Sequence, residues 1–234
     1  MDGLAHWITG PGVYLAVGVF ALGMAYRLDQ WRRVAASPMR LGIFPKPAPG
    51  TKVLRVVADT LLFPQLAEIN PSLWVGTIVF HAALAGVFVG HLHLLGRFPG
   101  RLEQMMTAGA GIVGGTMGVL WALATLYLLL RRFKSPYKEM STPEDYLLLL
   151  LILGVVVMGD HLRFLARLDV SVYQEYIRSL YAFRPALPAA LLNSPAKGSF
   201  AAHVGLANLL LMYLPFSKLV HFIGTFFTNG IRRG

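Results

Sequence analysis

The chain has 234 residues, of which 56% are hydrophobic and 14% are charged, and its formal net charge is +10. Soluble domains are roughly 45–50% apolar and about 25% charged, so this composition indicates a membrane protein. The sequence has no cysteine, which excludes disulfides, cysteine-ligated iron–sulfur clusters and covalent haem attachment within the chain. We attribute the positive charge to lipid headgroups and membrane topology and expect no nucleic-acid partner.

Five apolar runs predict the fold. They occupy residues 10–26, 73–95, 105–130, 146–166 and 201–222. A spanning helix needs about 20 apolar residues, and lipid offers no hydrogen bonds to an open backbone. We therefore expect an all-α bundle of about five transmembrane helices, forming one membrane domain over residues 1–234.

The distribution of Lys and Arg predicts the orientation of the bundle. Segments 27–72, 131–144 and 223–234 together carry thirteen of these residues, against seven in the remaining connections. This asymmetry favours the N-terminus outside and the C-terminus in the cytoplasm. Residues 1–9 carry no Lys or Arg, so we interpret the first run as a retained helix rather than a cleaved signal.

Two connections are long enough to have a structure of their own. Segment 27–72 contains a mixed apolar and charged run, Thr51 to Ile69, which is typical of a helix at the membrane interface or against a partner. A simple tethering loop is the alternative. Segment 167–200 holds three prolines and either caps an outer cavity or merely connects two helices.

A histidine inside a membrane is energetically costly, so each one is first interpreted as a functional residue. The second run carries His81 and His91, and the fifth carries His203 and His221. Because these two helices run in opposite directions, His81 pairs with His221 near the inner face, and His91 pairs with His203 near the outer face. A bis-histidine haem needs one imidazole on each side of its iron, and facing helices supply that arrangement.

Several points of this pairing stay open. The intervals of ten and eighteen residues correspond to rises of about 15 Å and 27 Å, and a kink at Pro215 is one way to reconcile them. His93 is a rival of His91 but faces another side of the helix, and Gly86 and Gly90 favour His91 by letting a flat macrocycle approach. Four histidines hydrogen-bonded to neighbouring helices are the structural alternative.

Three stretches resemble a known family. Residues 80–91 (FHAALAGVFVGH) are similar to the second helix of the gamma subunit of respiratory nitrate reductase, a membrane cytochrome b. Residues 214–221 (LPFSKLVH) resemble the end of its fifth helix, and residues 130–136 (LRRFKSP) resemble its connection between helices three and four. The resemblance covers roughly residues 73–225, and both histidine intervals fit the family.

The resemblance implies a function. Members of that family hold two haem b groups, oxidise quinol near the outer haem and pass electrons to a cytoplasmic iron–sulfur subunit. Carried over by motif, His81 and His221 are ligands of the inner haem iron, and His91 and His203 are ligands of the outer haem iron. We accordingly expect an electron-transfer subunit in a prokaryotic cell membrane that uses menaquinol.

The chain also departs from the nitrate-reductase type. Residues 169–180 (DVSVYQEYIRSL) resemble more closely the cytochrome of the sulfite-reductase-associated membrane complex of sulfur-metabolising prokaryotes. Glu103 stands where nitrate-reductase members carry a lysine beside the quinone pocket. We therefore favour the sulfur-type complex over nitrate reductase.

Further residues are assigned from position. Arg131 and Arg132 are candidate partners of the inner haem propionates, with membrane anchoring as the alternative. The quinol protons need acceptors, and the candidates are Asp160, His161, Glu103 and His93.

Two hypotheses concern the role of the whole chain. We expect the iron–sulfur partner to dock on segment 27–72 and on the tail from Phe227 to Gly234. A transporter that uses the membrane histidines as a proton or metal path is the competing function.

Overall fold

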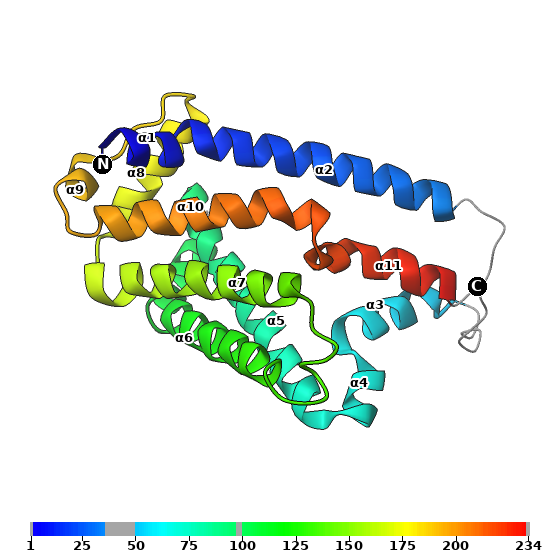
Figure 1. The fold of residues 1–234 in the computed structure, drawn as a ribbon. Coiled ribbons are helices and arrows are strands. Elements are labelled where there is room, and N and C mark those ends of the chain that lie inside the picture. The colour runs from blue at the N-terminus through cyan, green and yellow to red at the C-terminus, as the bar shows by residue number, and fades with distance from the viewer. Residues whose placement is uncertain (1, 36–49, 97–99, 233–234) are drawn as a thin grey trace. The chain divides into compact units, whose positions relative to one another are not determined.

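The computed structural model describes residues 2–35, 50–96 and 100–232, except for the side chains of residues 2, 35, 52, 102, 103, 105–113 and 229–232. These residues form helices and turns, with no strand among them, as expected from the sequence (Figure 1). The chain divides into two compact units. Unit 1 comprises Met1–Leu15 and Gly76–Leu210, and unit 2 comprises Ala16–Val75 and Leu211–Gly234.

Within the described ranges, five helices are long and apolar enough to cross a membrane, which confirms the predicted fold class of a multi-pass membrane protein. They are Gly3–Val34, Pro71–Leu95, Gly114–Arg131, Pro143–Ala166 and Lys197–Phe216. The first span extends well beyond the predicted residues 10–26, because the helix continues through a polar and basic stretch up to Ala35. The orientation of the bundle and its organisation as one domain stay predictions.

Local signals in the sequence explain where several helices begin. α1 (Asp2–Thr9) is followed by Gly10, and α2 (Pro11–Ala35) starts at a proline, the residue that suits a first helical turn. α7 (Pro143–His161) also starts at a proline, and Thr142 and Asp145 cap it reciprocally. α5 (Pro71–Leu92) is preceded by Asn70, whose side chain accepts a hydrogen bond from the amide of Leu73.

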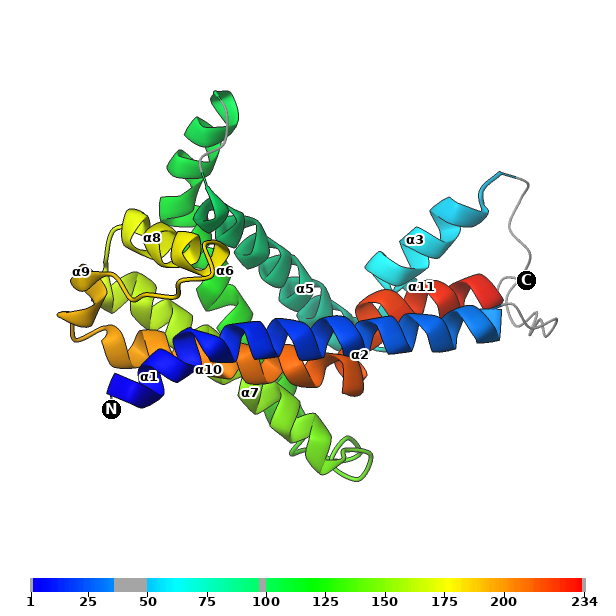
Figure 2. The ribbon, with the colours of Figure 1, turned by 90° about the horizontal axis from the view of Figure 1, so that it is seen from above.

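Unit 1 contains most of the spans. α6 (Arg101–Arg131) and α7 lie side by side in both views (Figure 2). Glycines on α6 let α7 approach: Gly115 faces Phe164, and a Cβ at Gly118 would collide with the carboxyl of Asp160. Close approach through small residues is the usual way in which membrane helices pack.

The connection 167–200 folds over the ends of two spans instead of forming an open loop. α8 (Val170–Tyr181) and α9 (Ala189–Leu192) share an apolar cluster with the end of α7 and the start of α10 (Lys197–Tyr213). The buried members of this cluster are Leu162, Tyr176, Leu191, Ala196 and Phe200. The Tyr176 hydroxyl also donates a 2.6 Å hydrogen bond to the carbonyl of Thr9, which ties α8 to α1.

The predicted continuous helix over residues 201–222 differs from the structure. α10 ends at Tyr213, short 3-10 turns follow at Leu214–Phe216 and Lys218–Val220, and a new helix, α11 (His221–Arg232), begins at His221. Pro215 cannot donate to the helix ladder, and Ser217 takes an extended conformation, so the helix stops. The predicted kink at Pro215 is therefore a complete break.

Unit 2 has its own packing. α3 (Lys52–Leu62) lies beside α11, as Figures 1 and 2 both show, and α4 (Pro64–Ile69) follows it. Trp31 of α2 packs on Phe227 of α11 with ring centroids 5.5 Å apart. Segment 27–72 is thus partly helical, as the interface interpretation predicted. Its residues 36–49 lie outside the described structure.

Candidate functional site

The structure brings His91 and His203 together within unit 1. His91 lies in the last turn of α5 and His203 in the first half of α10. Their ring centroids are 6.4 Å apart, and the ring planes are 18° from parallel. The two imidazoles are therefore near-parallel neighbours.

A backbone carbonyl fixes the tautomer of each ring. Nδ1 of His91 lies 2.8 Å from the carbonyl oxygen of Val87, and Nδ1 of His203 lies 2.9 Å from that of Val155. A carbonyl oxygen can only accept, so Nδ1 carries the proton in both rings. In the neutral imidazole, Nε2 then has the lone pair that a metal requires.

Helix α7 supports His203 at a second point. A Cβ at Gly159 would stand 3.1 Å from Cε1 and 3.4 Å from Nδ1 of His203. Glycine therefore lets the ring lie close to α7, where the carbonyl of Val155 holds it. Sequence reasoning did not identify either position, because a backbone carbonyl and a missing side chain leave no chemical signature in the sequence.

His81 and His221 show the same hydrogen-bond pattern. Nδ1 of His81 lies 2.8 Å from the Thr77 carbonyl oxygen, and Nδ1 of His221 lies 3.0 Å from that of Lys218. His81 belongs to unit 1 and His221 to unit 2, and their relative placement is not determined. The pairing of these two residues therefore stays a prediction.

The spacing of the His91 and His203 rings is compatible with a bis-histidine haem. With metal–nitrogen bonds of about 2 Å and a ring nitrogen roughly 1 Å from its centroid, two ligating imidazoles place their centroids roughly 6 Å apart. The observed 6.4 Å agrees with this value. Among the described residues, no group of three or more His, Cys, Asp or Glu side chains gathers as a metal site. A haem held by two histidines does not need a group of three such side chains.

His93, the rival of His91, lies elsewhere. Its side chain is buried, and its carbonyl accepts a 2.9 Å hydrogen bond from the amide of Gln174 on α8. Of the two glycines that favoured His91, Gly90 has open space at its Cβ position, whereas Gly86 lies against Met117 of α6. Gly86 thus serves helix packing, and only Gly90 leaves room beside α5.

The two arginines at the end of α6 have partners at or before the start of α7. The guanidinium of Arg131 lies 3.5 Å from the centre of the Tyr137 ring. Arg132 contacts Ser141 at 3.1 Å and Asp145 at 3.4 Å. These contacts order the connection, and a role with haem propionates stays a prediction for both residues.

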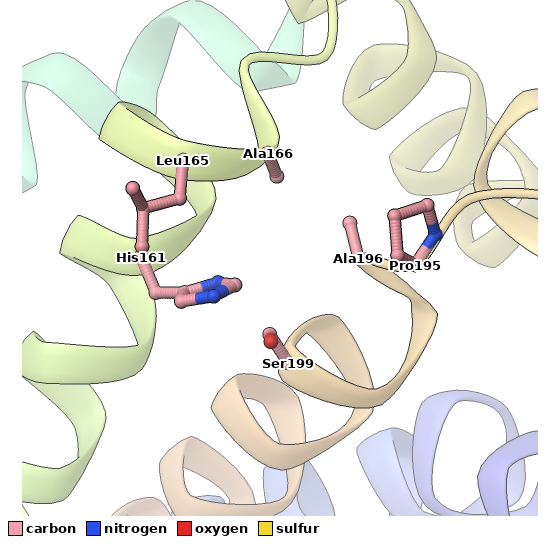
Figure 3. A pocket seen from close by; sticks show the side chains of 6 residues that line it. All are labelled: His161, Leu165, Ala166, Pro195, Ala196 and Ser199. Carbon is pink, nitrogen blue, oxygen red and sulfur yellow. The ribbon is translucent and has the colours of Figure 1, made fainter.

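The three candidate proton acceptors whose side chains the structure describes, Asp160, His161 and His93, do not form one group. Asp160 points toward Gly118 of α6, and His93 lies against α8. His161 lines a cavity between the ends of α7 and α10 (Figure 3). The side chain of Glu103 lies outside the described structure. Ser199, which lines the same cavity as His161, was not predicted, because one serine beside a proline-rich connection has no distinctive pattern.

The five apolar spans among the described residues define a multi-pass membrane protein, in which α5 and α10 bring His91 and His203 next to each other. Residues 64–229 match the nitrate reductase gamma subunit family, and the chain belongs to that family of the prokaryotic cell membrane. The family resemblance noted from the sequence is thereby confirmed.

Two archaeal relatives are similar over nearly the whole chain. One, from Archaeoglobus fulgidus, is 28% identical over 97% of this chain and 79% of its own length. The other, from Archaeoglobus profundus, is 24% identical over 92% of this chain and 75% of its own length. Both are named Hdr-like menaquinol oxidoreductase cytochrome b-like subunit.

Proposed function

We propose that this chain is a cytochrome b subunit that binds two haem b groups and carries electrons from menaquinol to an iron–sulfur subunit of a membrane-bound oxidoreductase complex. The observation that carries the proposal is the His91–His203 pair, whose rings are 6.4 Å apart with Nδ1 of each engaged by a carbonyl. The names of the two archaeal relatives support menaquinol as the electron donor.

The proposed ligands of the outer haem are His91 and His203, and those of the inner haem are His81 and His221. A bound haem would supply one-electron chemistry between a two-electron donor and a one-electron acceptor. The residues of the chain hold the imidazoles in the neutral tautomer and orient them, chiefly through the carbonyls of Val87 and Val155.

The proposed dock for the iron–sulfur subunit is the surface of α3 and α11. The sequence predicted segment 27–72 and the tail from Phe227 onward as docking parts, and α3 and α11 are neighbours within unit 2. We further propose that this surface is cytoplasmic, following the distribution of Lys and Arg. A sulfur-type complex, rather than a nitrate reductase, remains our prediction for the whole assembly.

The dock can be tested with a truncation that keeps one contact between α2 and α11. A chain truncated after Thr228 keeps the Trp31–Phe227 ring contact and loses Arg232 with the rest of the tail. We expect the truncated chain to keep its haem content but to lose most of its co-purification with the iron–sulfur subunit. Unchanged assembly would show that the tail is not part of the dock.

The cytochrome proposal itself is tested by reduced-minus-oxidised spectra and haem quantification of the purified chain. We expect the spectrum of haem b and about two haems per chain, one for each histidine pair. One haem would mean that one of the pairs is structural. A colourless protein would refute the proposal and favour the transporter interpretation.

A further inference from the structure

The break between α10 and α11 lies directly before His221 (Figure 1). α10 ends at Tyr213, Pro215 is fully buried, and α11 begins at His221 itself. In a continuous helix the amide of Leu219 would donate to the carbonyl of Pro215, four residues earlier. Here that amide donates to the hydroxyl oxygen of Ser217 at 3.2 Å instead. The break therefore frees the carbonyl of Pro215 for another donor.

Arg27 of α2 is that donor. Its Nε donates a 2.9 Å hydrogen bond to the Pro215 carbonyl. A carbonyl beside the apolar layer needs a donor from the protein, and a charged donor forms a bond roughly twice as strong as a neutral one. The guanidinium is itself held from the next turn of α2, where Gln30 accepts a 3.3 Å bond from Nη1.

The same face of α2 packs on the break. Gly23, Arg27 and Trp31 follow one another at intervals of four residues, so they share one face of the helix. A Cβ at Gly23 would stand 2.8 Å from Cβ of Pro215, closer than two such carbons come. Glycine therefore lets α2 lie directly on the proline ring, within reach of the bond from Arg27.

Farther along, this face also contacts the chain after His221. Trp31 packs on Phe227 of α11, and a Cβ at Gly224 would stand 3.2 Å from the indole ring. All of these residues belong to unit 2. One face of α2 thus holds the chain both before and after His221, and it bridges the break like a splint.

The orientation of the His221 imidazole depends on this break. Nδ1 of His221 donates to the carbonyl of Lys218 at 3.0 Å, and Lys218 opens the 3-10 turn that leads into α11. Ser217 caps this turn and donates its hydroxyl proton to the carbonyl of Leu214 at 3.1 Å. Contacts therefore connect the Arg27–Pro215 bond, through the capped turn, to the ring. If Pro215 moved, the turn and the imidazole would move with it.

We propose that Arg27 is a positioning residue of His221, and that its bond to the Pro215 carbonyl fixes the turn that orients this imidazole. The inference rests on the proposed cytochrome function, in which His221 is a ligand of the inner haem. It adds a residue from α2 that sets the geometry of this ligand and, through it, the redox properties of the inner haem.

The role of Arg27 can be tested in the purified, haem-containing chain. Arg27→Met removes the donor, and Arg27→Lys keeps a charged donor. Hydrogen exchange measured by mass spectrometry reports on the amides of residues 216–222. The EPR spectrum of the oxidised chain reports the angle between the two imidazole planes at each haem, and the inner haem is the signal that His221→Ala lacks.

We expect Arg27→Met to speed exchange in residues 216–222 by about tenfold, the effect of one lost hydrogen bond. The same variant should shift the EPR signal and the reduction potential of the inner haem and leave the outer haem unchanged. Arg27→Lys should restore most of both properties, because a lysine ammonium can donate to the same carbonyl.

Two further variants serve as control and as second test. Arg33→Met removes a guanidinium from the same helix, but Arg33 is exposed and pairs with Asp29 at 2.7 Å, so this variant should behave as the unaltered chain does. Gly23→Ala presses on Pro215 from the same face of α2 and should disturb the inner haem even if Arg27→Met folds poorly.

Several results would overturn the proposal. Unchanged exchange and EPR signals in both Arg27→Met and Gly23→Ala would do so. Faster exchange with an unchanged inner-haem signal would show that Arg27 holds the turn without orienting the ligand. An equal effect of Arg33→Met would assign the change to lost charge. Absence of haem from the unaltered chain would instead refute the cytochrome function itself, whatever the exchange rates.

Discussion

Gly159 sets how closely α7 approaches the imidazole of His203. In Gly159→Ala, the new Cβ would stand 3.1 Å from Cε1 of His203. Ordinary contacts between carbon atoms are about 3.5–4.0 Å, so the ring must retreat from α7 by roughly 0.4 Å or more. Because the carbonyl of Val155 is on the same helix, this retreat lengthens its 2.9 Å bond to Nδ1 toward the long end of the usual range.

A weaker bond at Nδ1 would make His203 a poorer ligand of the proposed haem. Loss of such a supporting contact typically costs about 10–100-fold in metal affinity. We expect Gly159→Ala to weaken binding of the outer haem by about tenfold and to shift its reduction potential, with the inner haem unchanged. Haem quantification after extensive dilution and a potentiometric titration measure the two effects.

Gly154 offers a matched control on the same helix. A Cβ there would stand 3.1 Å from a terminal methyl of Leu206, which can rotate away, instead of from the imidazole. Gly154→Ala should therefore leave both haems and their potentials unchanged. If the two variants lose haem equally, or if neither changes the outer haem, the argument from Gly159 is refuted.

Two predictions concern packing. Tyr176→Phe removes the buried donor to the Thr9 carbonyl and should destabilise the protein by about 1–3 kcal/mol in a thermal or denaturant melt. Burial raises the pKa of both Tyr176 and Tyr173, so both are protonated at neutral pH, but Tyr173 has no hydrogen-bond partner among the described residues. Tyr173→Phe should therefore be neutral, and equal losses would contradict this assignment. Gly118→Ala forces the carboxyl of Asp160 aside and should cost about 1–3 kcal/mol, which the double variant with Asp160→Ala recovers. If the double variant is no more stable than Gly118→Ala alone, the collision with Asp160 is not the cause of the lost stability.

Much of the fold could be predicted because membrane spans depend on length and apolarity alone. The span Pro143–Ala166 begins within three residues of the predicted run and ends at the same residue. The end of the fifth helix was harder to predict. The run stays apolar beyond Tyr213, but Pro215 removes a donor and Ser217 adopts an extended backbone. Hydropathy does not register either effect, so His221 was assigned to the wrong helix.

The candidate site was predictable as far as its side chains carry chemistry. His91 and His203 were paired from the opposite directions of their helices, and the structure places their ring centroids 6.4 Å apart. Their supports were not predictable, because Val155 acts through its carbonyl and Gly159 through the absence of a side chain. The cavity beside His161 is formed in part by a π-turn. Such a turn is recognised only from the three-dimensional path of the chain.

The most direct test of the account is the haem content of four single variants, with histidine replaced by alanine at positions 81, 91, 203 and 221. The account predicts two pairs. Variants at 91 and 203 lose the same haem, identified by its potential, and keep the other, and variants at 81 and 221 show the reverse. Loss of the outer haem in only one of the variants at 91 and 203, or full haem content in both, would contradict the central claim that these two imidazoles hold one iron between them.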